Sequence, residues 1–228
     1  MDFPDAEYPA APYPGVVPDR SFVHVPGGGI AVLPDPGMPS GWRVRGGDLD
    51  GFLDVPLGQR TPLLTYGSNR NPAKIGWLRA QLGLTGQVVV LRARTTGVAA
   101  VWAHGLRIVD DQRPAVLATA PGVVEEHAVW YATPAQVEVL DVCEGRRSGR
   151  YRLAHLHTGE VRTEDGTVHP DVATYLGDAG IRRPLLVDGR MVRCADVPQT
   201  GARGLRGAPA PSDGLDATTI PKALDAGG

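Results

Sequence analysis

Glycine and proline are unevenly distributed along the chain, and their distribution locates the part that can fold. They account for 20 of the first 60 residues, 22 of residues 61–198 and 9 of the last 30. Ordering a backbone is hardest to offset where glycine is dense and apolar side chains are few. The distribution predicts a compact domain at residues 61–198, with a disordered N-terminus at residues 1–20 and a disordered tail at residues 199–228.

Residues 21–60 are also rich in glycine and proline, but they carry apolar runs. Two short runs, at residues 22–25 and 30–33, flank Pro26-Gly27-Gly28-Gly29, and this pattern predicts a hairpin. Four further apolar residues could cover the domain: Trp42, Leu49, Phe52 and Leu53. We therefore expect residues 21–60 to form an extension that is partly packed on the core.

Charge and cysteine content exclude several classes of function. The formal net charge of −2 at pH 7 argues against a dedicated nucleic-acid or membrane-surface binder. No apolar run approaches the roughly 20 residues that span a bilayer, and the N-terminus lacks the pattern of a signal peptide. Two cysteines, Cys143 and Cys194, give neither a disulfide framework nor a metal cluster. The sequence predicts a cytoplasmic protein without nucleic-acid or membrane partners and leaves the oligomeric state open.

A first helix is predicted to begin at Asn71-Pro72. Asparagine suits the N-cap position, and proline at the first helical position loses no hydrogen bond. The apolar residues that follow are spaced as one helical stripe: Ile75, Leu78 and Leu82. Gly83 is suited to end this helix in a left-handed conformation.

A second helix is predicted to begin after Thr133. Threonine with Gln136 three residues later forms a capping box, and Pro134 again occupies the first helical position. The helix should run to about Cys143, with Gly145 beyond its end.

The remaining apolar segments of the domain are rich in β-branched residues. Strands are predicted at residues 63–66, 87–94, 98–103, 115–119, 127–132, 151–157 and 172–176, with a closing hairpin at 185–187 and 191–194. Many strands with two helices predict an α+β domain, a small mixed β-barrel with a few helices.

The loop Tyr66-Gly67-Ser68-Asn69 lies between a predicted strand and a predicted helix. Glycine lets the backbone turn sharply and approach a ligand closely. The unsatisfied amides of the following turn can hold an anion such as a carboxylate. The alternative is an ordinary strand-to-helix turn, in which Asn69 or Asn71 only caps the helix.

Glu144 lies at the end of the second helix, directly before Gly145. Carbonyl dipoles at a helix C-terminus oppose a negative charge, and burial would raise the pKa of this carboxyl further. Such a carboxylate suits proton transfer near neutral pH. The alternative is a surface glutamate paired with Arg146 and Arg147, which would lower its pKa.

Other residues near these segments have simpler explanations. Three tryptophans in apolar segments are expected in the core: Trp77, Trp102 and Trp130. Cys143 adjoins the proposed site, but cysteine is more often a small core residue than a nucleophile. Four arginines form a basic cluster that is either a solvated face or a contact for a substrate carboxylate: Arg146, Arg147, Arg150 and Arg152.

Taken together, two segments resemble a known family. Residues 64–69, which read LTYGSN, resemble the strand and YGSN loop of the γ-glutamylcyclotransferases. Residues 137–153, which read VEVLDVCEGRRSGRYRL, resemble the LDxxEGxxxGxY segment of the same family. The resemblance covers about residues 61–178. Two features differ from the family: Arg70 follows the loop where apolar residues are familiar, and the N-terminal extension is foreign to it.

The resemblance implies a fold, a reaction and roles for single residues. It implies a γ-glutamylcyclotransferase-like fold and release of 5-oxoproline and an amine from a small γ-glutamyl compound, without metal or organic cofactor. The backbone of residues 66–69 would hold the glutamyl head group, and Glu144 would act as general acid and base. Tyr151 would line the pocket, and Tyr175 would be a further pocket tyrosine. The rival hypothesis is a non-catalytic small-molecule-binding or regulatory protein with the same barrel.

Overall fold

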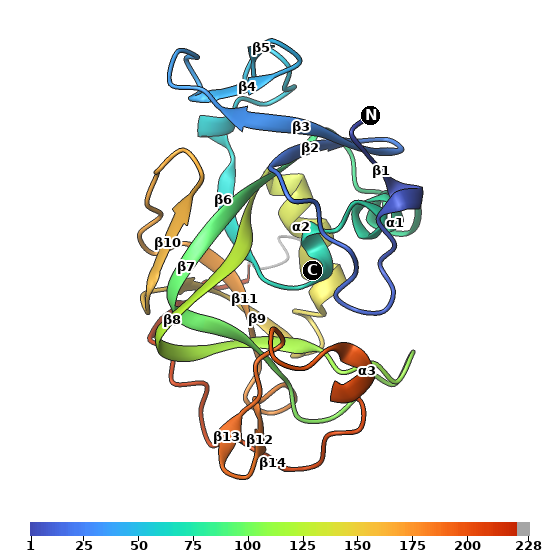
Figure 1. Cartoon of the computed structure of the whole chain (residues 1–228), viewed down its shortest axis with the longest axis vertical. Coiled ribbons are helices and arrows are strands. Elements are labelled where there is room, and N and C mark those ends of the chain that lie inside the picture. The colour runs from blue at the N-terminus through green and yellow to red at the C-terminus, as the bar shows by residue number, and fades with distance from the viewer. Residues whose placement is uncertain (223–228) are drawn as a thin grey trace, which may run out of the picture.

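A long antiparallel strand pair forms the centre of the molecule (Figure 1). The computed structural model describes residues 1–222. Strand β7 (Val88–Trp102) pairs with β8 (Ala115–Ala132), with a register shift between Thr96 and Val98. The sequence predicted two separate strands in each of these segments. The structure joins them because both strands run on through the polar and glycine-containing stretches. Residues 95, 96 and 98 of β7 are paired, and residues 120–123 of β8 form a bulge without partners on β7.

The remaining strands extend this pair into a mixed sheet. Its strand order is β15-β9-β11-β6-β8-β7-β2-β3-β4-β5, with β1 on β3 and β10 on β7. The bounds are β1 Phe3–Pro4, β2 Phe22–Val25, β3 Gly28–Pro34, β4 Trp42–Val44, β5 Gly47–Asp48, β6 Thr61–Thr65, β9 Tyr151–Leu156, β10 Glu160–Thr163, β11 Ala173–Gly177 and β15 Ala217–Thr219. The predicted α+β class is confirmed. Across residues 1–222 the two ends of this path do not pair with each other, so the sheet is not a closed barrel.

A small second sheet lies at one end of the long axis of the molecule, opposite β4 and β5 (Figure 1). It contains β12 (Leu185–Val187), β13 (Arg190–Met191) and β14 (Ala208–Pro209). The hairpin of β12 and β13 turns at Asp188-Gly189, as predicted from the sequence.

Both predicted helices form, and both begin and end as their sequence signals indicate. Helix α1 (Pro72–Leu82) has Asn71 as its N-cap, whose side chain accepts a hydrogen bond from the Lys74 amide at 2.8 Å. Helix α2 (Pro134–Glu144) has both hydrogen bonds of the capping box between Thr133 and Gln136. Each of these bonds satisfies an amide that the first helical turn leaves without a partner.

The two helices pack against the sheet through a shared core. Ile75 and Leu78 of α1 and Leu140 of α2 are at most 2% exposed, and they join Leu63 of β6 and Trp130 of β8 in one apolar cluster. Trp77 of α1 was expected in the core but is 46% exposed. It lies off the stripe formed by residues 75, 78 and 82, so it points away from the sheet.

Residues 1–20 were expected to be disordered and residues 21–60 to be partly packed on the core; in the structure both segments contact the core. Phe3 is 6% exposed and packs against Phe22 in the core shared with the helices. Trp42 and Leu49 are buried in a second cluster on β7, together with Val89 and other residues. Residues 1–60 therefore form part of the packed structure.

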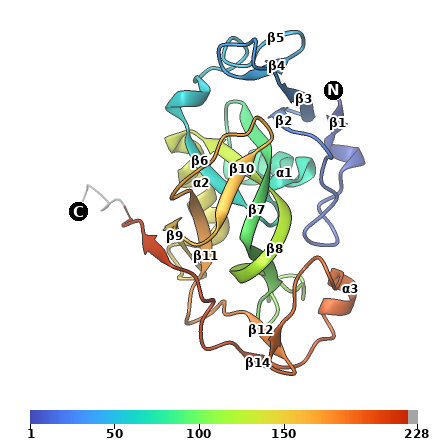
Figure 2. The ribbon, with the colours of Figure 1, turned by 60° about the vertical axis from the view of Figure 1, so that its left-hand side comes forward.

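The C-terminal segment is also packed as far as Ile220, and residues 223–228 of the predicted tail lie outside the described residues. The guanidinium of Arg113 donates hydrogen bonds to the carbonyls of Ala202 and Leu205, at 2.7 and 3.0 Å. Strand β15 pairs with β9 along the sheet edge, as Figure 2 shows. The hydrogen bonds from Arg113 anchor the short helix α3 (Gln199–Ala202).

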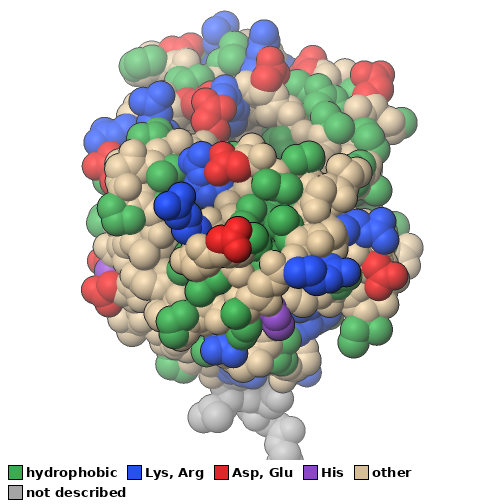
Figure 3. Space-filling model, turned by 60° about the horizontal axis from the view of Figure 1, so that its bottom comes forward, with side chains coloured by type: hydrophobic (Ala, Val, Ile, Leu, Met, Phe, Trp, Pro, Cys, Tyr) green, Lys and Arg blue, Asp and Glu red, His purple; other side chains and the backbone are tan. Residues whose placement is uncertain are grey.

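The surface and the helices give two further observations. On the face shown in Figure 3, basic, acidic and hydrophobic side chains are interspersed, without a large patch of one charge sign. Within residues 1–222, no helix combines the length and apolar character needed to cross a membrane.

Candidate active site

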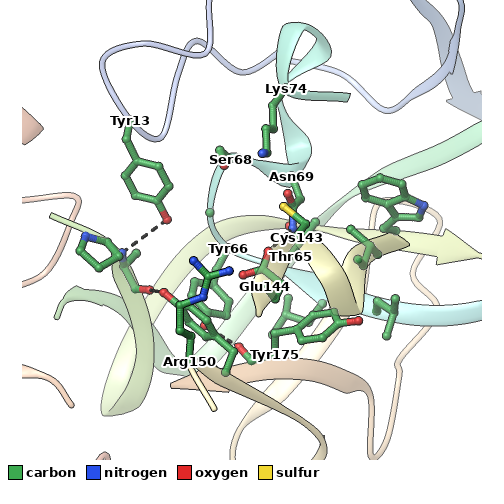
Figure 4. A pocket seen from close by; sticks show the side chains of 18 of the residues that line it. Tyr13, Thr65, Tyr66, Ser68, Asn69, Lys74, Cys143, Glu144, Arg150 and Tyr175 are labelled. Carbon is green, nitrogen blue, oxygen red and sulfur yellow. Dashed lines mark hydrogen bonds between the residues drawn. The ribbon is translucent and has the colours of Figure 1, made fainter. Parts of the chain in front are cut away.

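The loop after β6 and the end of α2 meet at one cavity of about 140 Å³ (Figure 4). The side-chain amide of Asn69 donates a hydrogen bond to Oε1 of Glu144 at 2.6 Å, although these residues are 75 positions apart. All four residues of the loop line the cavity: Tyr66, Gly67, Ser68 and Asn69. Two motifs that are distant in the sequence therefore form one site.

The loop is more than a helix-capping turn. Asn71 caps α1, whereas Asn69 is turned toward Glu144. Residues Ser68–Arg70 form one turn of 3-10 helix (η3), whose first amides have no acceptor within the turn. Arg70, which departs from the family pattern, does not line this cavity and donates to the carbonyl of Glu126 at 2.8 Å.

The pKa of Glu144 is raised, and burial of the carboxyl in the cavity is the main cause. The hydrogen bond from Asn69 opposes this shift, as do the positive charges of Lys74 and Arg150. Arg146, which the sequence offered as an ion-pair partner, binds Asp141 instead at 2.8 Å. Glu144 therefore faces the cavity with a carboxyl that holds its proton to a higher pH than an ordinary glutamate.

Gly145 allows the chain to leave α2 beside this carboxyl. Its φ is +65°, in the left-handed region where other residues are strained. A Cβ atom at this position would also lie 2.0 Å from Nε of Arg150. The glycine after Glu144 therefore ends the helix and lets the Arg150 guanidinium pass over the turn.

The three tyrosines that the sequence pointed to all line the cavity: Tyr66, Tyr151 and Tyr175. Each hydroxyl group donates its hydrogen bond to an acceptor within the protein. Tyr66 donates to the carbonyl of Tyr175 at 2.5 Å, and Tyr151 donates to the carbonyl of Ala115 at 2.8 Å. Tyr175 donates to Oδ1 of Asp141 at 2.7 Å. Burial raises the pKa of all three phenols, so they form a rigid, uncharged wall.

Four polar residues of the cavity carried no sequence signal for this site: Tyr13, Lys74, Arg107 and Arg182. Tyr13 comes from the segment that was expected to be disordered. Its hydroxyl accepts a hydrogen bond from the Ala115 amide at 3.4 Å, and its ring lies 5.4 Å from the Arg107 guanidinium. A Cβ atom on Gly67 would lie 2.6 Å from this hydroxyl, so glycine in the loop makes room for Tyr13.

Asn71 explains how the segment with Tyr13 is held. Its side-chain amide donates to the carbonyls of Tyr8, Pro9 and Val16, at 3.0, 3.2 and 2.5 Å. The same side chain caps α1 through its oxygen. One buried asparagine thus fixes both the helix after the loop and the segment opposite the loop.

Nucleophile and metal chemistry have little support at this site. Cys143 lines the cavity, but burial raises the pKa of its thiol to about 11, which keeps it protonated. In the part of the chain that the structure describes, no group of three or more His, Cys, Asp or Glu residues could hold a metal ion. Among the described residues that line the cavity, Glu144 is the one carboxylic acid.

Comparisons with known proteins give distant structural similarity. The chain matches no protein-family model and no curated protein. One similar solved structure, named "Gamma-glutamyl cyclotransferase", is 18% identical, with 54% of this chain and 70% of that chain covered and a TM-score of 0.43. An uncharacterized protein from Homo sapiens is 20% identical, with 52% and 67% covered and a TM-score of 0.41. YkqA from Bacillus subtilis is 13% identical, with 70% and 57% covered and a TM-score of 0.37. The chain resembles γ-glutamylcyclotransferase-like structures at low sequence identity.

Proposed function

We propose that this protein is a γ-glutamylcyclotransferase-type enzyme, which releases 5-oxoproline and an amine from a small γ-glutamyl compound. The observation that carries the proposal is the pairing of the buried Glu144 carboxyl with Asn69, across a cavity lined by residues 66–69. The sequence resemblance of both segments to that family supports the same reaction.

In the proposed reaction Glu144 passes two protons, one after the other, from the attacking nitrogen to the leaving nitrogen. Its carboxylate first removes a proton from the α-ammonium group of the glutamyl substrate. The freed amine attacks the γ-carbonyl carbon of the same glutamyl group and forms a five-membered ring. Glu144 gives its proton to the leaving nitrogen, the bond from the carbon to that nitrogen breaks, and the ring nitrogen gives up its second proton through Glu144 to the leaving amine, which departs as an ammonium ion. Such acid–base catalysis contributes about 10²–10⁴-fold in rate.

The raised pKa of Glu144 supports this role. A general base works best when its pKa approaches the working pH, because it is then both deprotonated and basic enough to remove a proton. Asn69 holds one carboxyl oxygen, which leaves the other free to face the substrate. An ordinary exposed glutamate would be a weaker base.

The walls of the cavity make a second contribution to the reaction rate, because they position the substrate. The amides of the loop at residues 66–69 would hold the substrate α-carboxylate, and the phenol wall of Tyr66, Tyr151 and Tyr175 would keep the glutamyl chain folded. A reactant held in its reactive geometry behaves as if it were extremely concentrated. The reaction needs no water, so a narrow cavity suits it.

A non-catalytic binding or regulatory protein is the second candidate. The observation in its favour is that Tyr13, from the N-terminal segment, extends into the cavity and fills part of it. A binding protein, however, has no use for a buried carboxyl with a raised pKa.

The test is to incubate the purified protein with a panel of γ-glutamyl amino acids and γ-glutamyl amines and to measure 5-oxoproline. The enzyme hypothesis expects product from at least one compound, and loss of that product in Glu144→Gln. Binding of these compounds without product from any of them would favour the binding protein.

A further inference from the structure

Basic side chains outnumber acidic ones around the cavity. Lys74, Arg107, Arg150 and Arg182 line it, and Glu144 is the acidic residue among its lining residues. The chain as a whole has a formal net charge of −2. The positive excess is therefore a property of this cavity and does not reflect a basic protein.

Within residues 1–222, three of these basic groups lack an acidic partner, and one of the three, Lys74, lies over an aromatic ring. Arg107 pairs with Asp110, and the Lys74 ammonium lies 3.7 Å from the centre of the Trp77 ring. Arg150 and Arg182 form no ion pair within residues 1–222, and Nε of Arg182 is buried there without a hydrogen-bond partner. A buried guanidinium nitrogen without a partner costs free energy, so a bound anion is the expected compensation at Arg182. Arg150 is exposed and lies at the same cavity as a second positive charge.

Tyr13 offers a further donor in the same cavity. The hydroxyl hydrogens of Tyr66, Tyr151 and Tyr175 are bound to protein acceptors. The Tyr13 hydroxyl accepts from the Ala115 amide, but its own hydrogen has no acceptor in the described part of the chain. Figure 4 shows this hydroxyl directed toward the cavity, with Arg150 beside Glu144.

The glutamyl half of a substrate does not account for this charge. Its α-carboxylate and α-ammonium groups cancel, and the loop at residues 66–69 already offers amides to the carboxylate. The positive charge and the free phenol donor remain for the other half of the substrate. That half is the leaving amine, whose nitrogen must lie next to the γ-carbonyl.

We propose that Tyr13, Arg150 and Arg182 form a subsite for an acidic leaving amine, one that carries two carboxylates, such as an amino acid with an acidic side chain. This inference rests on the proposed function. The two guanidinium groups would each bind a carboxylate, and the Tyr13 hydroxyl would donate to one of them. These three residues lie outside the loop at residues 66–69 and the glutamate that carry the proposed reaction.

An isosteric substrate pair tests this subsite. γ-Glutamyl-glutamate and γ-glutamyl-glutamine differ by one negative charge on the leaving group and have nearly the same shape. We expect kcat/KM for 5-oxoproline release to be at least about tenfold higher for γ-glutamyl-glutamate, chiefly through a lower KM. Equal values, or a preference for γ-glutamyl-glutamine, would overturn the proposal.

A matched pair of variants assigns the preference to the subsite. Arg182→Gln should bring the ratio of the two kcat/KM values toward one. Arg183→Gln removes the same charge from the next residue, which does not line the cavity, and should keep the wild-type ratio. An unchanged ratio in Arg182→Gln would contradict the assignment of this arginine.

Calorimetric binding separates this inference from the proposed function. Tighter binding of γ-glutamyl-glutamate than of γ-glutamyl-glutamine, without 5-oxoproline from either, would support the subsite and overturn the reaction. Release of 5-oxoproline from both at equal kcat/KM, with equal affinity, would support the reaction and overturn the subsite.

Discussion

The cavity has two walls with different origins. The first wall comes from the loop at residues 66–69 and the end of α2, where a glycine, two helix caps and a glutamate are all visible in the sequence. The second wall comes from Tyr13 and Arg182, which lie in connecting segments without a sequence signal and which, with Arg150, form the proposed subsite. In our account the first wall supplies the chemistry and the second selects the substrate. The following predictions, from the largest effect to the smallest, separate these two roles.

Removing the acid–base group of the first wall should have the largest effect. Glu144→Gln keeps the shape of the side chain but cannot accept the substrate proton, so kcat should fall by at least about 10²-fold. The matched control is Glu138→Gln, an exposed glutamate of the same helix that does not line the cavity. Steady-state 5-oxoproline release measures kcat of both variants. A near-normal kcat in Glu144→Gln would contradict the claim that the first wall supplies the chemistry.

Removing the residue that joins the two walls should chiefly affect stability. Asn71→Ala loses the cap of α1 and the donor to three carbonyls of the N-terminal segment, so the free energy of unfolding should fall by about 2–3 kcal/mol. Thr133→Ala, which loses only the side-chain cap of α2, should cost about 1 kcal/mol. Urea denaturation compares the two variants. Equal losses would mean that the N-terminal segment is not held by Asn71.

Removing the donor of the second wall should have a smaller effect that depends on the substrate. Tyr13→Phe should lower kcat/KM for an acidic leaving group by about tenfold and leave that for a neutral leaving group within about twofold. Tyr8→Phe removes a hydroxyl from the same segment, at a residue that does not line the cavity, and should match the wild type. An equal decrease of kcat/KM for both substrates in Tyr13→Phe would contradict the claim that the second wall selects the substrate.

Removing Asn69, the hydrogen-bond donor to the Glu144 carboxylate, should shift the pH dependence of kcat/KM. The hydrogen bond from Asn69 lowers the pKa of Glu144, so Asn69→Ala should raise that pKa further. The base form is lost as the pH falls through this value. The acid limb of kcat/KM should therefore lie at a higher pH in Asn69→Ala than in the wild type. A shift to lower pH would contradict the assigned bond.

The contrast between the walls also explains what the sequence could predict. Caps and terminating glycines act within one or two turns of the chain, so Asn71, Thr133 and Gly145 marked the ends of α1 and α2 correctly. The family resemblance added the expected roles of Glu144 and of the loop at residues 66–69. These signals describe the first wall and little else.

The remaining features depend on contacts between distant segments. Phe3 stands in a segment rich in proline, and its burial requires Phe22 and the helices as partners. Asn71 gave a local cap signal, but its three bonds to residues 8–16 could not be foreseen from that signal. The exposure of Trp77 followed from the helical phase of α1, which the apolar composition of the segment concealed.

The pH dependence of 5-oxoproline release by the wild-type protein tests the central claim most directly. If Glu144 is the base and burial raises its pKa, the acid limb of kcat/KM should have its midpoint above the ordinary glutamate value of 4.5. That limb should disappear, together with most of the rate, in Glu144→Gln. A midpoint at or below 4.5, or a limb that persists unchanged in the variant, would contradict the account.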